Sequence, residues 1–173
     1  PNVARLDFGT GNWTVYPEAN GNPSHILGNN VTDSSGNVWL YKTSDASTHR
    51  TRLDLRRPDG TWFNTPLAPF DQTITNSAAA IRTIGPGKVL VVDGGGTAYR
   101  FNGTNWQNLG MWQNTPSTYD VDQDAAGNIW VCGMGGAAKR SASTGVWTRY
   151  RLTNTSQYDQ FVNDLTLAPN GDV

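Results

Sequence analysis

Short runs of apolar and β-branched residues alternate with turn-forming residues along the whole chain. The clearest stretch has such runs at 118–124, 128–133, 137–142 and 146–152. The turns between them contain Ala-Ala-Gly, Gly-Gly and Thr-Gly, and each supplies a residue that tolerates a positive φ in a hairpin. The pattern therefore predicts four short antiparallel strands between residues 118 and 152.

The same pattern returns along the chain. A turn glycine followed by a β-rich run recurs at intervals of 51, 40 and 44 residues, at Gly36, Gly87, Gly127 and Gly171. An Arg-led strand, a tight turn and a Trp recur at intervals of 49, 44 and 41 residues, ending at Trp13, Trp62, Trp106 and Trp147. Four strands in each such period are typical of a β-propeller blade. A sandwich or a barrel also has short strands, but neither fold requires the same Gly and Trp to return once in every four strands.

The period divides the chain into three blades at 26–67, 77–110 and 117–152, with partial blades at 1–17 and 162–173. With the strands of a blade lettered A to D, the first partial piece supplies strands C and D, and the last supplies strand A and the start of B. These two pieces either complete one shared blade or belong to a longer chain with more blades. We expect the longer chain, in which these repeats form part of a larger propeller.

Composition supports an all-β fold and excludes several classes of function. The chain has 20 Thr, 17 Asn and 19 Gly but a single Glu, so that turn and strand formers outnumber strong helix formers. Charged residues make up 16% and the net charge is -1, which leaves no basic field for nucleic acid.

The lone Cys132 excludes an intramolecular disulfide framework and a multi-cysteine zinc site. No apolar run approaches the roughly 20 residues of a membrane helix, so we expect no membrane insertion. The short polar side chains resemble the surfaces of secreted microbial proteins, and we predict an extracellular or cell-surface location.

Residues 124–150 carry the sequence D-x-x-G-N-I-W-V, a Gly-Gly turn, an Arg-containing strand, Thr-Gly and W-T-R-Y. This run resembles the propeller repeats in the sensor regions of bacterial two-component regulators. The resemblance extends to 33–62 and, more weakly, to 85–106, where Leu90 stands in place of the Trp. It implies a blade and not an activity, because propellers include enzymes, lectins and scaffolds.

Ligands of propellers usually bind where the D-to-A and B-to-C connections gather around the central channel. Three of the four D-to-A connections place an aromatic residue beside amides or a carboxylate, which is suited to neutral glycans or to a protein interface. The candidate ligand-binding residues are Phe70, Asp71, Trp112, Gln113, Asn114, Tyr158, Asp159, Gln160 and His25. The competing interpretation is that the loop aromatics pack on blade edges.

The remaining chemical signals favour structural roles. Asp124 is expected to form a turn, while Asp120 and Asp122 are expected to face solvent or pair with Arg, rather than to hold calcium. Gly94-Gly95-Gly96 is expected to be a hairpin and not a phosphate loop, because no Lys-Ser/Thr follows it. The recurring Trp residues are expected to fill the space between blades; they are Trp13, Trp39, Trp62, Trp106, Trp130 and Trp147. We therefore predict no catalytic residue, metal site or cofactor.

These observations favour a non-enzymatic recognition or interaction module at the cell surface, for a glycan or a protein. One alternative is a hydrolase or lyase with its site at the channel mouth, drawing on His25, Asp71 and Asp159 or on other blades. The other is a structural component of a surface assembly or filament, in which the open sheet edge is completed by another chain or by self-assembly.

Overall fold

The computed structural model describes residues 3–16, 30–43, 51–66, 78–112, 117–151, 161–168, 170, 172 and 173. Within these residues all regular structure is β, and no described segment is a helix long and apolar enough to cross a membrane. In order, the strands are β1 (Val3–Leu6), β2 (Trp13–Tyr16), β3 (Val31–Thr32), β4 (Val38–Thr43), β5 (Thr51–Arg56), β6 (Trp62–Asn64), β7 (Ala78–Gly85), β8 (Lys88–Asp93), β9 (Thr97–Phe101), β10 (Trp106–Met111), β11 (Thr118–Gln123), β12 (Ile129–Gly133), β13 (Gly136–Arg140) and β14 (Trp147–Tyr150).

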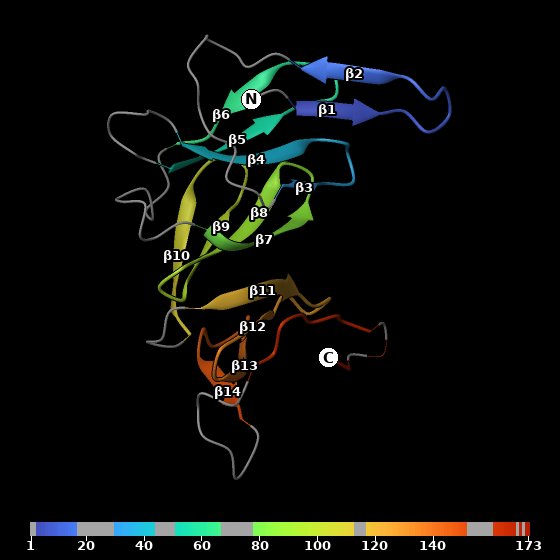
Figure 1. Ribbon diagram of the computed structural model, residues 1–173. Coiled ribbons are helices and arrows are strands. Elements are labelled where there is room, and N and C mark those ends of the chain that lie inside the picture. Colours follow the sequence, from blue (N-terminus) through green and yellow to red (C-terminus); the bar gives the residue numbers. More distant parts are fainter. Residues whose placement is uncertain are drawn as a thin grey trace.

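The strands form a two-stranded sheet, β1–β2, and three four-stranded sheets, β3–β6, β7–β10 and β11–β14. Within each sheet, every strand pairs antiparallel with the next one along the chain, so each four-stranded sheet is a meander. The sheets follow one another through the molecule in sequence order (Figure 1). This confirms the all-β fold of repeated four-stranded antiparallel blades.

Local turn chemistry explains why the strands end where they do. Asp124 Oδ1 accepts hydrogen bonds from the backbone N–H of Ala126 (3.1 Å) and of Asn128 (2.8 Å), and Gly127 takes a φ of 82°. This confirms that Asp124 forms a turn. The Gly94–Gly96 segment is likewise a hairpin, closed by a 3.0 Å bond from Gly96 N to Asp93 O.

Two apolar clusters fill the spaces between neighbouring four-stranded sheets. The first seam lies between β3–β6 and β7–β10, and its buried residues are Trp39, Tyr41, Leu53, Leu55, Ile81, Val89, Val91, Tyr99 and Phe101. The second seam lies between β7–β10 and β11–β14, and its buried residues are Ala80, Leu90, Val92, Ala98, Leu109, Trp112, Val121, Ile129, Val131 and Ala138. Strand β8 serves both seams, because its alternate side chains point to opposite faces.

The periodic Trp residues behave in two ways. Trp39 is fully buried with its ring 5.8 Å from that of Phe101 across the first seam, and Trp106 and Trp147 pack against the two clusters. These three confirm the packing role. The same expectation is wrong for Trp13, which is 66% exposed, because its hairpin does not place the ring between two four-stranded sheets.

Candidate functional site

The first strands of neighbouring sheets lie close together, since β7 contacts both β3 and β11. One end of the sheets carries the β8–β9 turn at 94–96, the β12–β13 turn at 134–135, and the start of β11. We call this end the loop face. It is the end at which the D-to-A connections were expected to gather.

Eight of the nine candidate ligand-binding residues lie outside the described part of the chain. They are Phe70, Asp71, Gln113, Asn114, Tyr158, Asp159, Gln160 and His25. Their role as a ligand site therefore stays a prediction.

The ninth, Trp112, does not form an exposed platform. It is 1% exposed and belongs to the core of the second seam. Its Nε1–H donates to Thr118 Oγ1 (2.9 Å), its backbone N–H donates to Gly96 O (3.0 Å), and its carbonyl accepts from Arg149 Nε (2.6 Å). The sequence interpretation was wrong on its location because Trp112 directly follows β10 and turns inward, so that this side chain cannot stack on a ligand in this arrangement.

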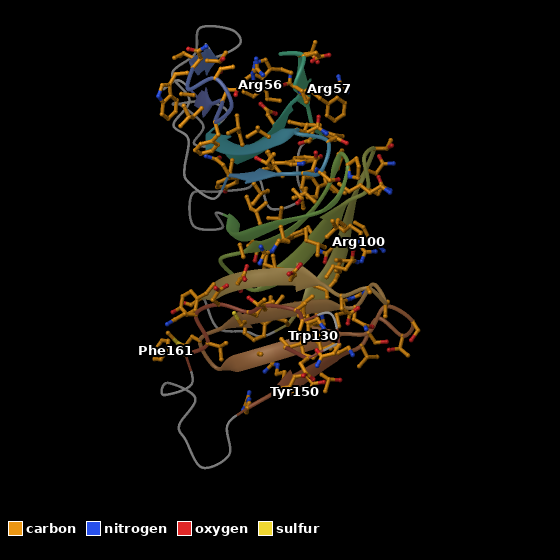
Figure 2. The ribbon with its side chains drawn as sticks, turned by 90° about the vertical axis from the view of Figure 1, so that its right-hand side faces the viewer. Arg56, Arg57, Arg100, Trp130, Tyr150 and Phe161 are labelled. Carbon is orange, nitrogen blue, oxygen red and sulfur yellow. The ribbon has the colours of Figure 1, made fainter. Side chains whose placement is uncertain are left out.

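Other apolar side chains at the loop face are exposed. Met111, Tyr119 and Phe161 are 49%, 39% and 52% exposed. Phe161 forms a β-bridge with Met134, and the next backbone N–H, that of Val162, donates to Gly133 O (3.2 Å). Figure 2 shows Phe161 on one side of the β11–β14 sheet, away from Trp130 and Tyr150.

A charged cluster links the inner strands. From β7, Arg82 reaches β11, where its Nη2 lies 3.1 Å from Asp120 Oδ2, its Nε lies 3.7 Å from Asp122 Oδ2, and its Nε–H donates to Val121 O (3.2 Å). This confirms the expected Arg pairing of Asp120 and Asp122. Sequence reasoning did not identify Arg82 as the partner, because 38 residues separate it from Asp120.

The surroundings of this cluster raise the pKa of one of its carboxyl groups. Burial raises the pKa of Asp120, and a hydrogen bond to Asp164 raises it further, against the opposing effect of Arg82. Burial also raises the pKa of the nearby Cys132 thiol to about 12, with Asp120 adding to the effect. Cys132 is therefore a buried thiol and not an activated nucleophile.

The three carboxylates of the run from Asp120 to Asp124 do not converge on one point. Asp120 and Asp122 face Arg82, whereas Asp124 Oδ2 accepts from Asn128 Nδ2 (2.8 Å) and Trp130 Nε1 (3.1 Å). In the described segments, no group of three or more His, Cys, Asp or Glu side chains is placed to hold a metal ion.

Comparison with known proteins supports the architecture. No protein-family model matches the chain, and no curated protein matches it. Among solved structures, virginiamycin B lyase from Staphylococcus aureus aligns with a TM-score of 0.62 at 13% identity, over 88% of this chain and 49% of that one. A Ycf48 structure bound to the D1 peptide aligns with a TM-score of 0.60 at 14% identity, over 94% and 51%.

The extracellular domain of a hybrid two-component system from B. thetaiotaomicron aligns with a TM-score of 0.58 at 19% identity, over 91% of this chain and 22% of that one. The chain thus spans about half or less of the length of these solved chains. At such identities the likeness is one of fold. The chain has the β-propeller architecture that a sensor domain, Ycf48 and a lyase share, and the expected resemblance to the sensor propellers is confirmed at that level.

Proposed function

We propose that this chain belongs to a non-enzymatic recognition module at the cell surface, and that a glycan or a protein partner binds at its loop face. The observation that carries the proposal is the exposure of Met111, Tyr119 and Phe161 at this face. Apolar and aromatic side chains that stay exposed at the mouth of a rigid scaffold are typical anchors of a binding site. The predicted recognition loops adjoin them, since Gln160 directly precedes Phe161.

The scaffold suits this role because backbone bonds hold the anchors. Phe161 is fixed by its bridge to Met134 and by the bond from Val162 N to Gly133 O. A partner would therefore meet a site with little conformational freedom to lose on binding. The Ycf48 structure with its D1 peptide supports the proposal to the extent that a propeller of similar fold accommodates a peptide.

The test is a binding screen of the full-length protein against neutral glycans and cell-surface peptides. Phe161→Ala and Tyr158→Ala are each expected to lower the affinity for the ligand by at least about tenfold. The matched control is Phe8→Ala, which removes a ring that is 92% exposed in the β1–β2 turn, away from the loop face. Equal affinity in all three variants and the unmodified protein would remove the loop face from the proposal.

A second candidate function is acid–base catalysis at the channel, as in a hydrolase or lyase. The observation in its favour is the pair formed by Asp120 and Asp164, in which burial and the shared hydrogen bond raise the pKa of Asp120. A raised pKa is the direction of shift that general-acid catalysis by a carboxyl group requires. Turnover of a glycoside, ester or lactone by the full-length protein, abolished in Asp120→Asn, would favour this function over simple recognition.

A further inference from the structure

The second seam contains two arginines where the first seam is apolar. On β9, Arg100 lies opposite Leu90, and on β13, Arg140 lies opposite Ile129. Directly opposed residues of an antiparallel pair point to the same face. Because Leu90 and Ile129 both belong to the core of the second seam, Arg100 and Arg140 enter that seam from its two sides.

The repeat provides an internal comparison. The residues at the corresponding positions of the first seam are Leu55, opposite Trp39, and Phe101, opposite Val89. Both are buried in the first apolar cluster. The same two positions of one repeat therefore form an apolar contact in one seam and bring two positive charges together in the next.

The described residues do not balance these charges. Arg100 Nε is buried with no hydrogen-bond partner, and Arg140 donates from Nε to the carbonyl of Leu109 (2.9 Å). Burial and the positive charge of Arg140 lower the pKa of Arg100, and no carboxylate is among the groups that act on it. A guanidinium group stays charged in proteins, so deprotonation does not relieve the repulsion.

Three acidic groups on other strands of these two sheets are bound elsewhere. Asp93 accepts from Gly95 N (3.0 Å) and Thr97 N (2.8 Å) in its own turn, and Asp120 and Asp122 face Arg82. Partly buried charges without partners are costly, and this cost is removed when an anion binds between them. Planar guanidinium groups match the oxygens of carboxylates and sulfates in two-point hydrogen bonds.

We propose that Arg100 and Arg140 form an oxyanion-binding site in the second seam, which takes one carboxylate or sulfate group between the two guanidiniums. The site is separate from the loop face: Arg100 and Phe161 lie on opposite sides of the molecule in Figure 2. It does not depend on the recognition function proposed above.

The test is a titration of the protein with sodium sulfate and, separately, with sodium acetate, at constant ionic strength balanced by chloride. The Nε–H resonance of Arg100 is expected to shift and saturate, because this proton gains an acceptor. The thermal midpoint is expected to rise to a plateau about 2–4 °C higher. Saturation with both anions identifies a carboxylate-type site, and saturation with sulfate alone identifies a site for sulfate or phosphate groups.

Two variants separate site binding from the general stabilising effect of sulfate. Arg100→Leu restores the residue type of the first seam, so we expect an equal or higher thermal midpoint without anion and no plateau with it. Arg57→Gln is the matched control, because Arg57 is exposed and its guanidinium lies over Phe63 in another sheet. An unmoved Arg100 resonance, or a saturating rise of the thermal midpoint that persists in Arg100→Leu, would overturn the site.

Discussion

At the scale of single residues, Trp112 connects more parts of the second seam than its place after β10 suggests. Its ring is buried, and its polar groups bond to Gly96, Thr118 and Arg149. We expect Trp112→Ala to lower the free energy of unfolding by about 3–5 kcal/mol, as for other large-to-small changes in a core. Trp13→Ala, which removes an exposed ring, is expected to cost less than about 1 kcal/mol.

Urea unfolding followed by circular dichroism measures both variants. If Trp112→Ala left the stability unchanged and instead abolished binding of a ligand, the burial of this side chain would be contradicted and the earlier expectation of a ligand platform restored.

The side chain of Asp33 forms a hydrogen bond to the neighbouring blade. Burial alone would raise its pKa, but hydrogen bonds from Gly87, Asn37 and Ser35 outweigh burial and lower it. The bond from Gly87 N to Asp33 Oδ2 is 2.8 Å and joins the first turn of one four-stranded sheet to that of the next. A carboxyl group whose folded pKa is lowered contributes stability above its unfolded value of about 3.9, and this contribution is lost as the pH falls toward the folded pKa.

We therefore expect Asp33→Ala to cost about 1–3 kcal/mol at pH 7 and progressively less as the pH falls below about 4. The control is Asp59→Ala, which removes turn bonds to Thr61 N and Oγ1 (each 2.8 Å) at an exposed position of the β5–β6 turn. Chemical unfolding at several pH values measures the loss of unfolding free energy in each variant. An Asp33→Ala penalty that is constant from pH 7 to pH 3 would contradict the assigned linkage.

Sequence alone predicted the parts of the structure that depend on nearby residues. The strands of the third blade follow from turn residues such as Asp124 and Gly127, whose bonds span only a few positions. Contacts across seams were not predictable in this way. Arg82 reaches Asp120 over 38 positions, and Trp112 turns into the core because of the neighbouring sheet. The predicted binding loops lie outside the described residues, and only the location of Trp112 could be compared with the structure.

At the scale of elements, Gly133 lies where three chain segments meet. It pairs with Thr118 and with Gly136, and its carbonyl accepts from Val162 N. A Cβ added to Gly133 would overlap the carbonyl oxygen of Ser117 and lie 3.0 Å from Thr118 Cα. Because both atoms belong to the backbone, neither can rotate away, and the start of β11 would have to separate from the end of β12.

We therefore expect Gly133→Ala to destabilise the protein by about 2–4 kcal/mol and to weaken the segment that holds Phe161. Gly95→Ala is the control, because there an added Cβ meets only the Asp93 side chain, at 3.3 Å. Thermal unfolding and the amide exchange of Val162 report the two effects. Equal stability of the two variants would show that β11 and β12 can separate at little cost.

At the scale of the whole molecule, the described residues form two apolar seams that share strand β8, and both contribute to stability. Val89 and Leu90 are adjacent and both fully buried, yet Val89 belongs to the first seam and Leu90 to the second. In repeat architectures the stability is approximately the sum of each unit and of its interfaces with its neighbours. A substitution at Val89 therefore weakens the contact between β3–β6 and β7–β10, whereas one at Leu90 weakens the contact between β7–β10 and β11–β14.

Leu90→Ala is expected to increase amide exchange in β11–β14 more than in β3–β6, because the cavity weakens the second seam by about 2–5 kcal/mol. Val89→Ala is expected to have the opposite pattern, with increased exchange in β3–β6 and a smaller total loss because fewer methyl groups are removed. Hydrogen exchange read by mass spectrometry compares the two variants in the same peptides. If either variant raised exchange equally in all three four-stranded sheets, the described sheets would open together as a single cooperative unit, and independent seams would be refuted.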